Sequence, residues 1–125
     1  TATGGRLDDE EKMQALIAEG TLRDELRGPR LLDDAVRAEL TTARRRGATV
    51  TVLDEGGLDG LDDAALTKIR AQLAETLRTA VSDRIFIRTS AHDAVAVTVV
   101  GRSGEHAGLS DEDAVDLWRE IARRT

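Results

Sequence analysis

The spacing of apolar residues changes near residue 80, and this change limits the folds open to the chain. Over residues 62–80 apolar side chains recur every three or four positions, as on one face of an α-helix, at Leu66, Ile69, Leu73, Leu77 and Ala80. The segments RIFIRT at 84–89 and AVAVTVV at 94–100 instead alternate or are rich in β-branched residues, which is typical of strands. Because only SAHD at 90–93 separates them, we expect a helix over 62–80 followed by an antiparallel hairpin.

The part of the chain before residue 54 is predicted to hold helices and one strand. Residues 9–26 are helix-rich, and Gly20-Thr21 is expected to interrupt this segment. RGPR at 27–30 marks a break, since Pro29 can begin the next helix. That helix ends at Gly47, and its apolar face consists of Leu32, Val36, Leu40 and Ala43. ATVTVL at 48–53 is predicted to be a strand.

The C-terminal segment is predicted to be a helix over 111–124. Ser110 with Asp113 three positions later forms a variant of the capping box. Apolar residues recur at helical spacing, at Ala114, Leu117, Trp118 and Ile121. We expect Trp118 to pack on the sheet, because aromatic side chains contribute strongly to protein cores.

Helices and strands in this order predict an α+β fold. We expect a two-layer sandwich, in which a mixed β-sheet is covered by helices on one face. A chain of 125 residues fits one domain with a modest core. Phe86 and Trp118 are its only aromatic residues, so the core must consist mainly of Leu, Val, Ile and Ala.

Composition excludes several classes of protein. The net charge of −6 argues against general nucleic-acid binding. The absence of cysteine excludes disulfides and thiolate metal sites. No apolar run approaches the roughly 20 residues of a membrane span, and no signal-peptide pattern opens the chain. We therefore expect a cytoplasmic protein or a cytoplasmic fragment of a larger one.

The titratable clusters have simple structural interpretations. His92 and Asp93 lie in a predicted turn, where Asp is common, and His106 has no identifiable further ligands, so we expect no metal site. The acids in 7–11, 31–34 and 60–63 are expected just inside helix starts, where they favour the helix dipole. Arg44, Arg45 and Arg46 are expected at a helix C-terminus for the same reason.

Two long segments resemble a known family. They are LRDELRGPRLLDDAVRAELTTARRRGATVTVLDEGG and IRAQLAETLRTAVSDRIFIRTSAHDAVAVTVVGRSG. Both are similar to the region of bacterial sensor histidine kinases in which a dimerisation helix leads into the ATP-binding domain. The resemblance implies a truncated histidine kinase-like ATPase fold. It also implies an N-terminal helical segment at 1–29 and a degenerate ATPase domain at 30–125.

The family's magnesium-binding helix carries a glutamate, an asparagine four residues later, and then an Arg-His-Ala triplet. The resemblance places the triplet at residues 78–80, so Arg78 and Thr79 occupy its first two positions. Glu75 then replaces the asparagine that holds magnesium, and Ala71 replaces the glutamate that acts as general base. The resemblance therefore implies no catalytic residue, while a carboxylate at 75 can still bind magnesium.

The family's adenine-binding loop is an Asp-x-Gly-x-Gly motif. Here Val99 replaces the aspartate that accepts a hydrogen bond from adenine, while Gly101 and Arg102 follow as in the family. Weak nucleotide-binding candidates are therefore Glu75, Arg78, Thr79, Gly101 and Arg102. No cofactor is expected, because the positions that would complete an ATP–magnesium site have changed.

Three functions remain open from the sequence. The first is a catalytically inactive signal-transduction domain that acts through protein contacts or weak nucleotide binding. The alternative is a small structural or protein-interaction module unrelated to nucleotides, and the third is an active ATPase with unusual residues. A protein partner or a homodimer is expected, because apolar residues form an N-terminal stripe outside the predicted core, at Met13, Leu16, Ile17, Leu22 and Leu26.

Overall fold

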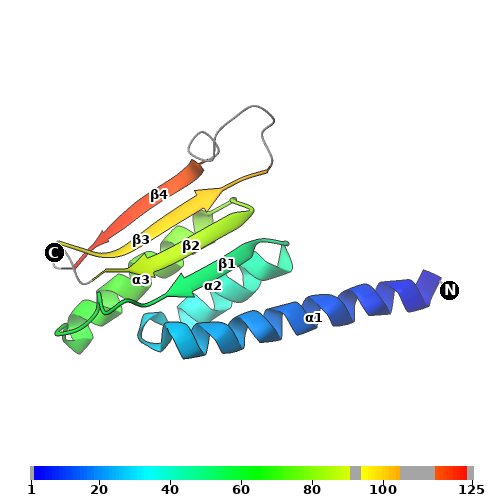
Figure 1. Cartoon of the computed structure of the whole chain (residues 1–125), viewed down its shortest axis with the longest axis horizontal. Coiled ribbons are helices and arrows are strands. Elements are labelled where there is room, and N and C mark those ends of the chain that lie inside the picture. The colour runs from blue at the N-terminus through cyan, green and yellow to red at the C-terminus, as the bar shows by residue number, and fades with distance from the viewer. Residues whose placement is uncertain (1, 91–93, 105–114, 124–125) are drawn as a thin grey trace.

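The computed structural model describes residues 2–90, 94–104 and 115–123. The helices are α1 (Ala2–Arg27), the short 3₁₀ helix η1 (Pro29–Leu31), α2 (Asp34–Arg45) and α3 (Asp63–Thr79). The strands are β1 (Thr49–Leu53), β2 (Arg84–Thr89), β3 (Val95–Arg102) and β4 (Val115–Ala122). The fold is α+β, and Figure 1 shows α2 and α3 together behind one face of the sheet.

The four strands form one mixed sheet in the order β1-β2-β3-β4. β1 and β2 are parallel and are connected through α3, whereas β2, β3 and β4 are antiparallel neighbours. The predicted hairpin of 84–89 with 94–100 is thus confirmed, as is the two-layer sandwich. α1 lies beside β1, and its N-terminal part extends beyond the sheet (Figure 1).

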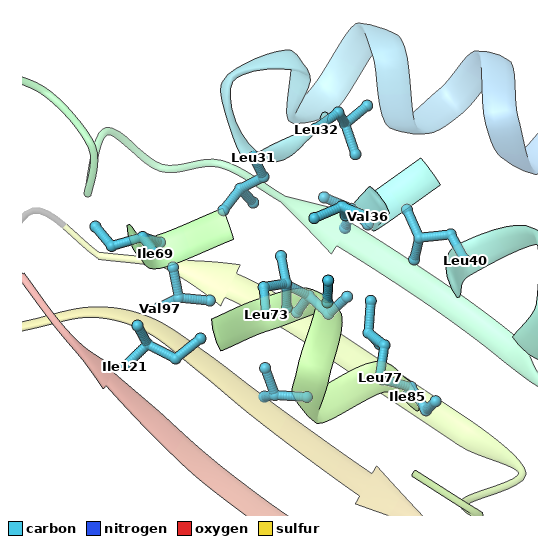
Figure 2. Close-up of a cluster of buried hydrophobic side chains, with 14 of the residues drawn as sticks. Leu31, Leu32, Val36, Leu40, Ile69, Leu73, Leu77, Ile85, Val97 and Ile121 are labelled. Carbon is cyan, nitrogen blue, oxygen red and sulfur yellow. The ribbon is translucent and has the colours of Figure 1, made fainter. Parts of the chain in front are cut away.

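The core is aliphatic and lies between the two helices and the sheet. Figure 2 shows side chains from α2 and α3 meeting residues of β2, β3 and β4. Leu73 on α3, Ile87 on β2 and Val99 on β3 are at most 1% exposed. The predicted helix faces are confirmed, because the buried residues include Val36, Leu40, Leu66, Ile69 and Leu77. Each fully buried side chain of this size stabilises the fold by about 1.5–3 kcal/mol.

Helix ends follow the predicted local chemistry. Asp33 and Asp62 are the N-cap residues of α2 and α3, and each accepts a hydrogen bond of 2.8 Å from a backbone N–H three residues later. Gly47 follows α2 with φ of 96°, which favours glycine. The acids at 7–11 differ from the prediction, because α1 begins at Ala2 and they lie inside it.

The expected interruption at Gly20-Thr21 is wrong, because α1 is continuous from Ala2 to Arg27. Gly20 is buried, and a Cβ atom there would lie 2.6 Å from Nε of Arg44. The missing side chain thus leaves space in which Arg44 of α2 crosses α1 and reaches Asp24. Tertiary packing explains why glycine stands at this position. In the middle of other helices a glycine ordinarily lowers helix stability.

The predicted helix over 111–124 is also wrong where the structure describes it. Val115–Ala122 forms strand β4, which pairs with the free edge of β3. Ile121 is buried and Leu117 packs against the core from this strand. Their spacing of four fits a helix face as well as alternate strand positions, so sequence periodicity alone does not separate the two. Trp118 consequently points away from the core and is 63% exposed, contrary to the expected packing.

Candidate functional site

The face of the sheet opposite α2 and α3 carries the chain's only Phe and only Trp. Phe86 on β2, Val100 on β3 and Trp118 on β4 are successive cross-strand partners, so they form one row. Phe86 is 39% exposed and Trp118 is 63% exposed. We call this surface the open face. Its residues are Arg84, Phe86, Arg88, Thr98, Val100, Arg102, Trp118 and Glu120.

A shallow hollow of about 560 Å³ lies on the open face. Phe86, Val100 and Trp118 contribute apolar surface to it, and Ser90 and Thr98 contribute polar groups. The Trp118 indole N–H donates to the Glu120 carboxylate at 3.1 Å, which helps to orient the ring. Arg88, Arg102 and Glu120 also line the hollow, so it combines aromatic surface with charged and polar groups.

Arginine side chains lie on both sides of the aromatic row. Arg84 and Arg102 are directly opposite each other on β2 and β3. Arg88 lies on the other side of the row, and its guanidinium group donates to Glu55 at 2.9 Å. The row therefore has arginine side chains at both ends, and Arg88 at one of them is paired with Glu55.

A second groove, of about 460 Å³, lies between α3 and β4. Glu75 and Thr79 line it from α3, and Trp118 and Arg119 line it from β4. Arg119 donates to the side-chain oxygen of Gln72 at 3.2 Å, which ties the strand to the helix. Trp118 thus lies at the boundary between this groove and the open face.

The structure does not bring the five predicted nucleotide-binding residues together. Glu75 and Thr79 lie in the α3–β4 groove, whereas Arg102 lies on the open face across the sheet. Arg78 forms ion pairs with Glu75 at 2.6 Å and with Glu39 at 3.6 Å.

Gly101 is buried, and neighbouring side chains cover it on the core side. A ligand therefore cannot reach its backbone from that side. A Cβ atom there would lie 2.7 Å from the Cβ atom of Ser82 and 2.9 Å from that of Leu117. Glycine at this position permits close packing between β3 and β4. Val99, at the position of the family's adenine-binding aspartate, is also fully buried in the core.

The segment that follows β3 is held by a polar cluster. Ser82 and Ser103 both donate hydrogen bonds to the Asp116 carboxylate, and the Gly104 N–H donates to Asp83 at 2.8 Å. The hydrogen bonds from Ser103 and then Ser82 lower the pKa of Asp116, because they stabilise its charged form. The serine and the glycine of this segment therefore have structural roles.

The alternation of polar or aromatic residues with isoleucine in RIFIRT indicates which residues of β2 lie on the open face. Ile85 and Ile87 are buried, so Arg84, Phe86 and Arg88 must point to the opposite side. This segment is predicted above only as a strand, with no role for its exposed face. No sequence pattern indicates that Trp118 lies on the open face, because its position depends on the pairing of β4 with β3.

Within the described ranges, no three His, Cys, Asp or Glu residues are grouped so as to hold a metal ion. His92, Asp93 and His106 lie outside those ranges. Among residues 2–90, 94–104 and 115–123, no helix combines the length and apolar character needed to cross a membrane.

No family model, no curated protein and no solved structure matches this chain.

Proposed function

We propose that this chain is a non-catalytic signalling domain that acts through protein contacts made by its open face. The observation that carries the proposal is the row of Phe86, Val100 and Trp118 on a sheet surface that α2 and α3 leave uncovered. A chain with only two aromatic residues would gain most stability by burying both of them. Both are instead substantially exposed on the same side.

The row lies directly above the packed core. Ile85, Ile87 and Val99 fill the core directly behind the open face, and each is at most 2% exposed. Exposed aromatic side chains on a fixed backbone bind partners with little loss of conformational entropy. The open face therefore suits recognition of another protein.

The arrangement of polar groups gives no support to catalysis. The candidates from the family resemblance are divided between the two faces of the sheet, and Glu75 is engaged by Arg78 at 2.6 Å. Resemblance to sensor kinases supports a signalling role, and the absence of cysteine fits the cytoplasmic setting that we include in the proposal.

Site-specific photo-crosslinking tests the proposal. A photoreactive phenylalanine analogue replaces Phe86 in one variant and Arg45, an exposed residue at the end of α2, in the control. In extract of the source cells we expect discrete crosslinked protein bands from position 86 and none of these from position 45. The same bands from both positions, or no band from position 86, would contradict the proposal.

Weak nucleotide binding in the α3–β4 groove is a second candidate function. It is favoured by the presence of Glu75, Thr79 and Trp118 in the same groove. Titration with ATP and magnesium, followed by calorimetry and by Trp118 fluorescence, tests it with Glu75→Ala as the comparison. We expect no ATP hydrolysis above a no-protein control, since Ala71 and Val99 replace the family's base and adenine acceptor.

A further inference from the structure

Strand β4 forms an uncovered edge of the sheet (Figure 1). It is the last strand in the order β1-β2-β3-β4, and no segment within residues 2–90, 94–104 and 115–123 pairs with its outer side. The opposite edge differs, because α1 lies beside β1 and the Arg44 guanidinium group donates to the backbone oxygen of Val50 at 3.1 Å. An uncovered edge offers unpaired N–H and C=O groups to a further strand.

The alternation of hydrogen bonds identifies which backbone groups of β4 point outward. The Ala96 carbonyl accepts a hydrogen bond from the N–H group of the residue after β2, so alternate residues of β3 from Ala96 onward face β2 and those between them face β4. Val99 is one of those that face β4, and its partner there is Arg119. The backbone of Arg119 is thus paired with β3, whereas the backbone groups of its neighbours Trp118 and Glu120 point to the free edge.

Two hollows lie along this edge on its helix side, between α3 and β4. The α3–β4 groove of about 460 Å³ lies beside Leu117 and Arg119. A second hollow, of about 310 Å³, lies between Lys68 of α3 and Ala122 of β4. A strand added at the free edge would place alternate side chains in these hollows and the others beside Trp118.

We infer that the free edge of β4 binds an extended segment of a partner protein as an antiparallel fifth strand. The segment carries a basic residue opposite Glu120, an acidic residue opposite Arg119 and a β-branched residue opposite Trp118. Opposite charges and aromatic–β-branched pairs stabilise neighbouring strands when they lie directly opposite each other. The inference goes beyond the proposed function, because it concerns the edge of the sheet rather than its open face.

The charges of β4 oppose pairing with a second copy of the same strand. Antiparallel pairing requires outward-facing residues of the two copies to lie opposite each other. In one of the two registers with the longest overlap, Trp118 lies opposite Trp118, which places Asp116 opposite Glu120. In the other register, Arg119 lies opposite Arg119. Like charges in directly opposite positions destabilise a sheet, so the edge favours a foreign segment with complementary charges.

Two peptides of identical composition test the inference by calorimetry and by the fluorescence of Trp118, the only tryptophan. The matched peptide is Ser-Thr-Val-Lys-Glu-Ile-Val-Thr-Ser. As an antiparallel strand it places its lysine opposite Glu120, its glutamate opposite Arg119 and its isoleucine opposite Trp118. The control peptide, Ser-Thr-Val-Glu-Lys-Ile-Val-Thr-Ser, exchanges the two charges. We expect the matched peptide to bind about tenfold more tightly than the control.

Backbone methylation of the matched peptide tests strand pairing directly. N-methylation of its isoleucine removes an N–H group that points to Trp118 of β4, and we expect binding to weaken by about tenfold or more. N-methylation of its glutamate removes an N–H group that points away from β4, so the effect on binding should be much smaller.

A protein with exchanged charges locates the contact. The double variant Arg119→Glu with Glu120→Arg should bind the control peptide more tightly than the matched peptide. Arg45→Glu, which changes an exposed residue at the end of α2, should keep the wild-type preference. Circular dichroism of each variant verifies that it is folded.

Several results would overturn the inference. They are failure of the matched peptide to bind, equal or tighter binding of the control by wild type, an equal loss from the two N-methyl groups, and an unchanged preference in the folded double variant. Conversion of a wild-type dimer into a monomer by the matched peptide in light scattering would also overturn it, because a second copy would then occupy the edge. The crosslinks expected from position 86 test the proposed function separately, whichever result the peptides give.

Discussion

Asp24 of α1 and Arg44 of α2 form a buried ion pair through two hydrogen bonds, of 2.6 and 3.0 Å. Arg44 also donates to the backbone oxygen of Val50 at 3.1 Å, so one side chain connects α1, α2 and β1. Asp24 and Arg44 are only 3% and 8% exposed. The long N-terminal helix is therefore attached to the sandwich by a polar contact as well as by apolar packing.

Removing one member of this pair should destabilise the protein strongly. We expect Arg44→Ala to lower the free energy of unfolding by about 3–5 kcal/mol, because it leaves the Asp24 carboxylate buried without a counter-charge. The double change Asp24→Leu with Arg44→Met should recover most of this loss. Urea denaturation of the single and double variants measures both effects. A loss below about 1 kcal/mol for Arg44→Ala would show that water reaches the site.

Thr89 should be essential to the loop that follows β1. Its hydroxyl group accepts hydrogen bonds from the backbone N–H groups of Glu55 at 2.7 Å and Gly57 at 3.1 Å, and it donates to Asp54 at 2.7 Å. Thr89→Val keeps the shape but removes the acceptor of the Glu55 and Gly57 N–H groups, so we expect a loss of about 1–3 kcal/mol. Thr49→Val, at an exposed position of β1, is the control for which thermal unfolding should change little.

The stability of the protein should depend on Asp116 in acid. Hydrogen bonds from Ser103 and Ser82 lower the pKa of this carboxyl in the folded state. Its contribution to stability is therefore complete above its unfolded pKa of about 3.9, and it is lost as the pH falls toward the lower folded value. We expect Asp116→Asn to lose less stability than wild type between pH 7 and pH 3 in denaturant titrations.

Glu10→Gln, on the exposed surface of α1, is the control for the acid titration. It should retain the wild-type difference in stability between the two pH values. A difference for Asp116→Asn as large as that of wild type would contradict the assignment.

Two residues of β4 should differ sharply in their effect on stability. Ile121 is fully buried, whereas Trp118 is 63% exposed on the open face. Ile121→Ala should cost about 2–5 kcal/mol. Trp118→Ala should cost less than about 1 kcal/mol, in keeping with a surface position. A larger loss from Trp118→Ala than from Ile121→Ala in thermal unfolding would support the helix expected from the sequence.

The apolar stripe of α1 divides into two faces. Met13 and Ile17 are half-buried toward β1, while Leu22 and Leu26 are 62% and 77% exposed. We expect Ile17→Asp to destabilise the fold. We also expect wild type to self-associate as a dimer through the exposed face, and Leu22→Asp to be a monomer in light scattering while it remains folded. A wild-type monomer at micromolar concentration would show that the exposed face is not used for self-association.

Local sequence determined the parts of the fold whose stabilising contacts lie close in the chain. The helix with Leu66, Leu73 and Leu77, the hairpin after it and the capping acids Asp33 and Asp62 all followed from spacing or from interactions within a few residues. The aliphatic character of the core also followed from composition, because the chain has only one Phe, one Trp and no Tyr that could fill it. The alternation of RIFIRT also requires Arg84 and Phe86 to share one face of the strand, although no prediction was made about that face.

Long-range contacts decided the rest. Leu117 and Ile121 satisfy both helical and strand spacing, and pairing with β3 selects the strand because it satisfies the backbone of both segments. This pairing places Trp118 beside Val100 and thereby completes the aromatic row. Gly20 looks like a helix break until Arg44 fills its space. Sequence periodicity reports only which side of an element is apolar, whereas partners distant in the chain decide what covers that side and what remains exposed.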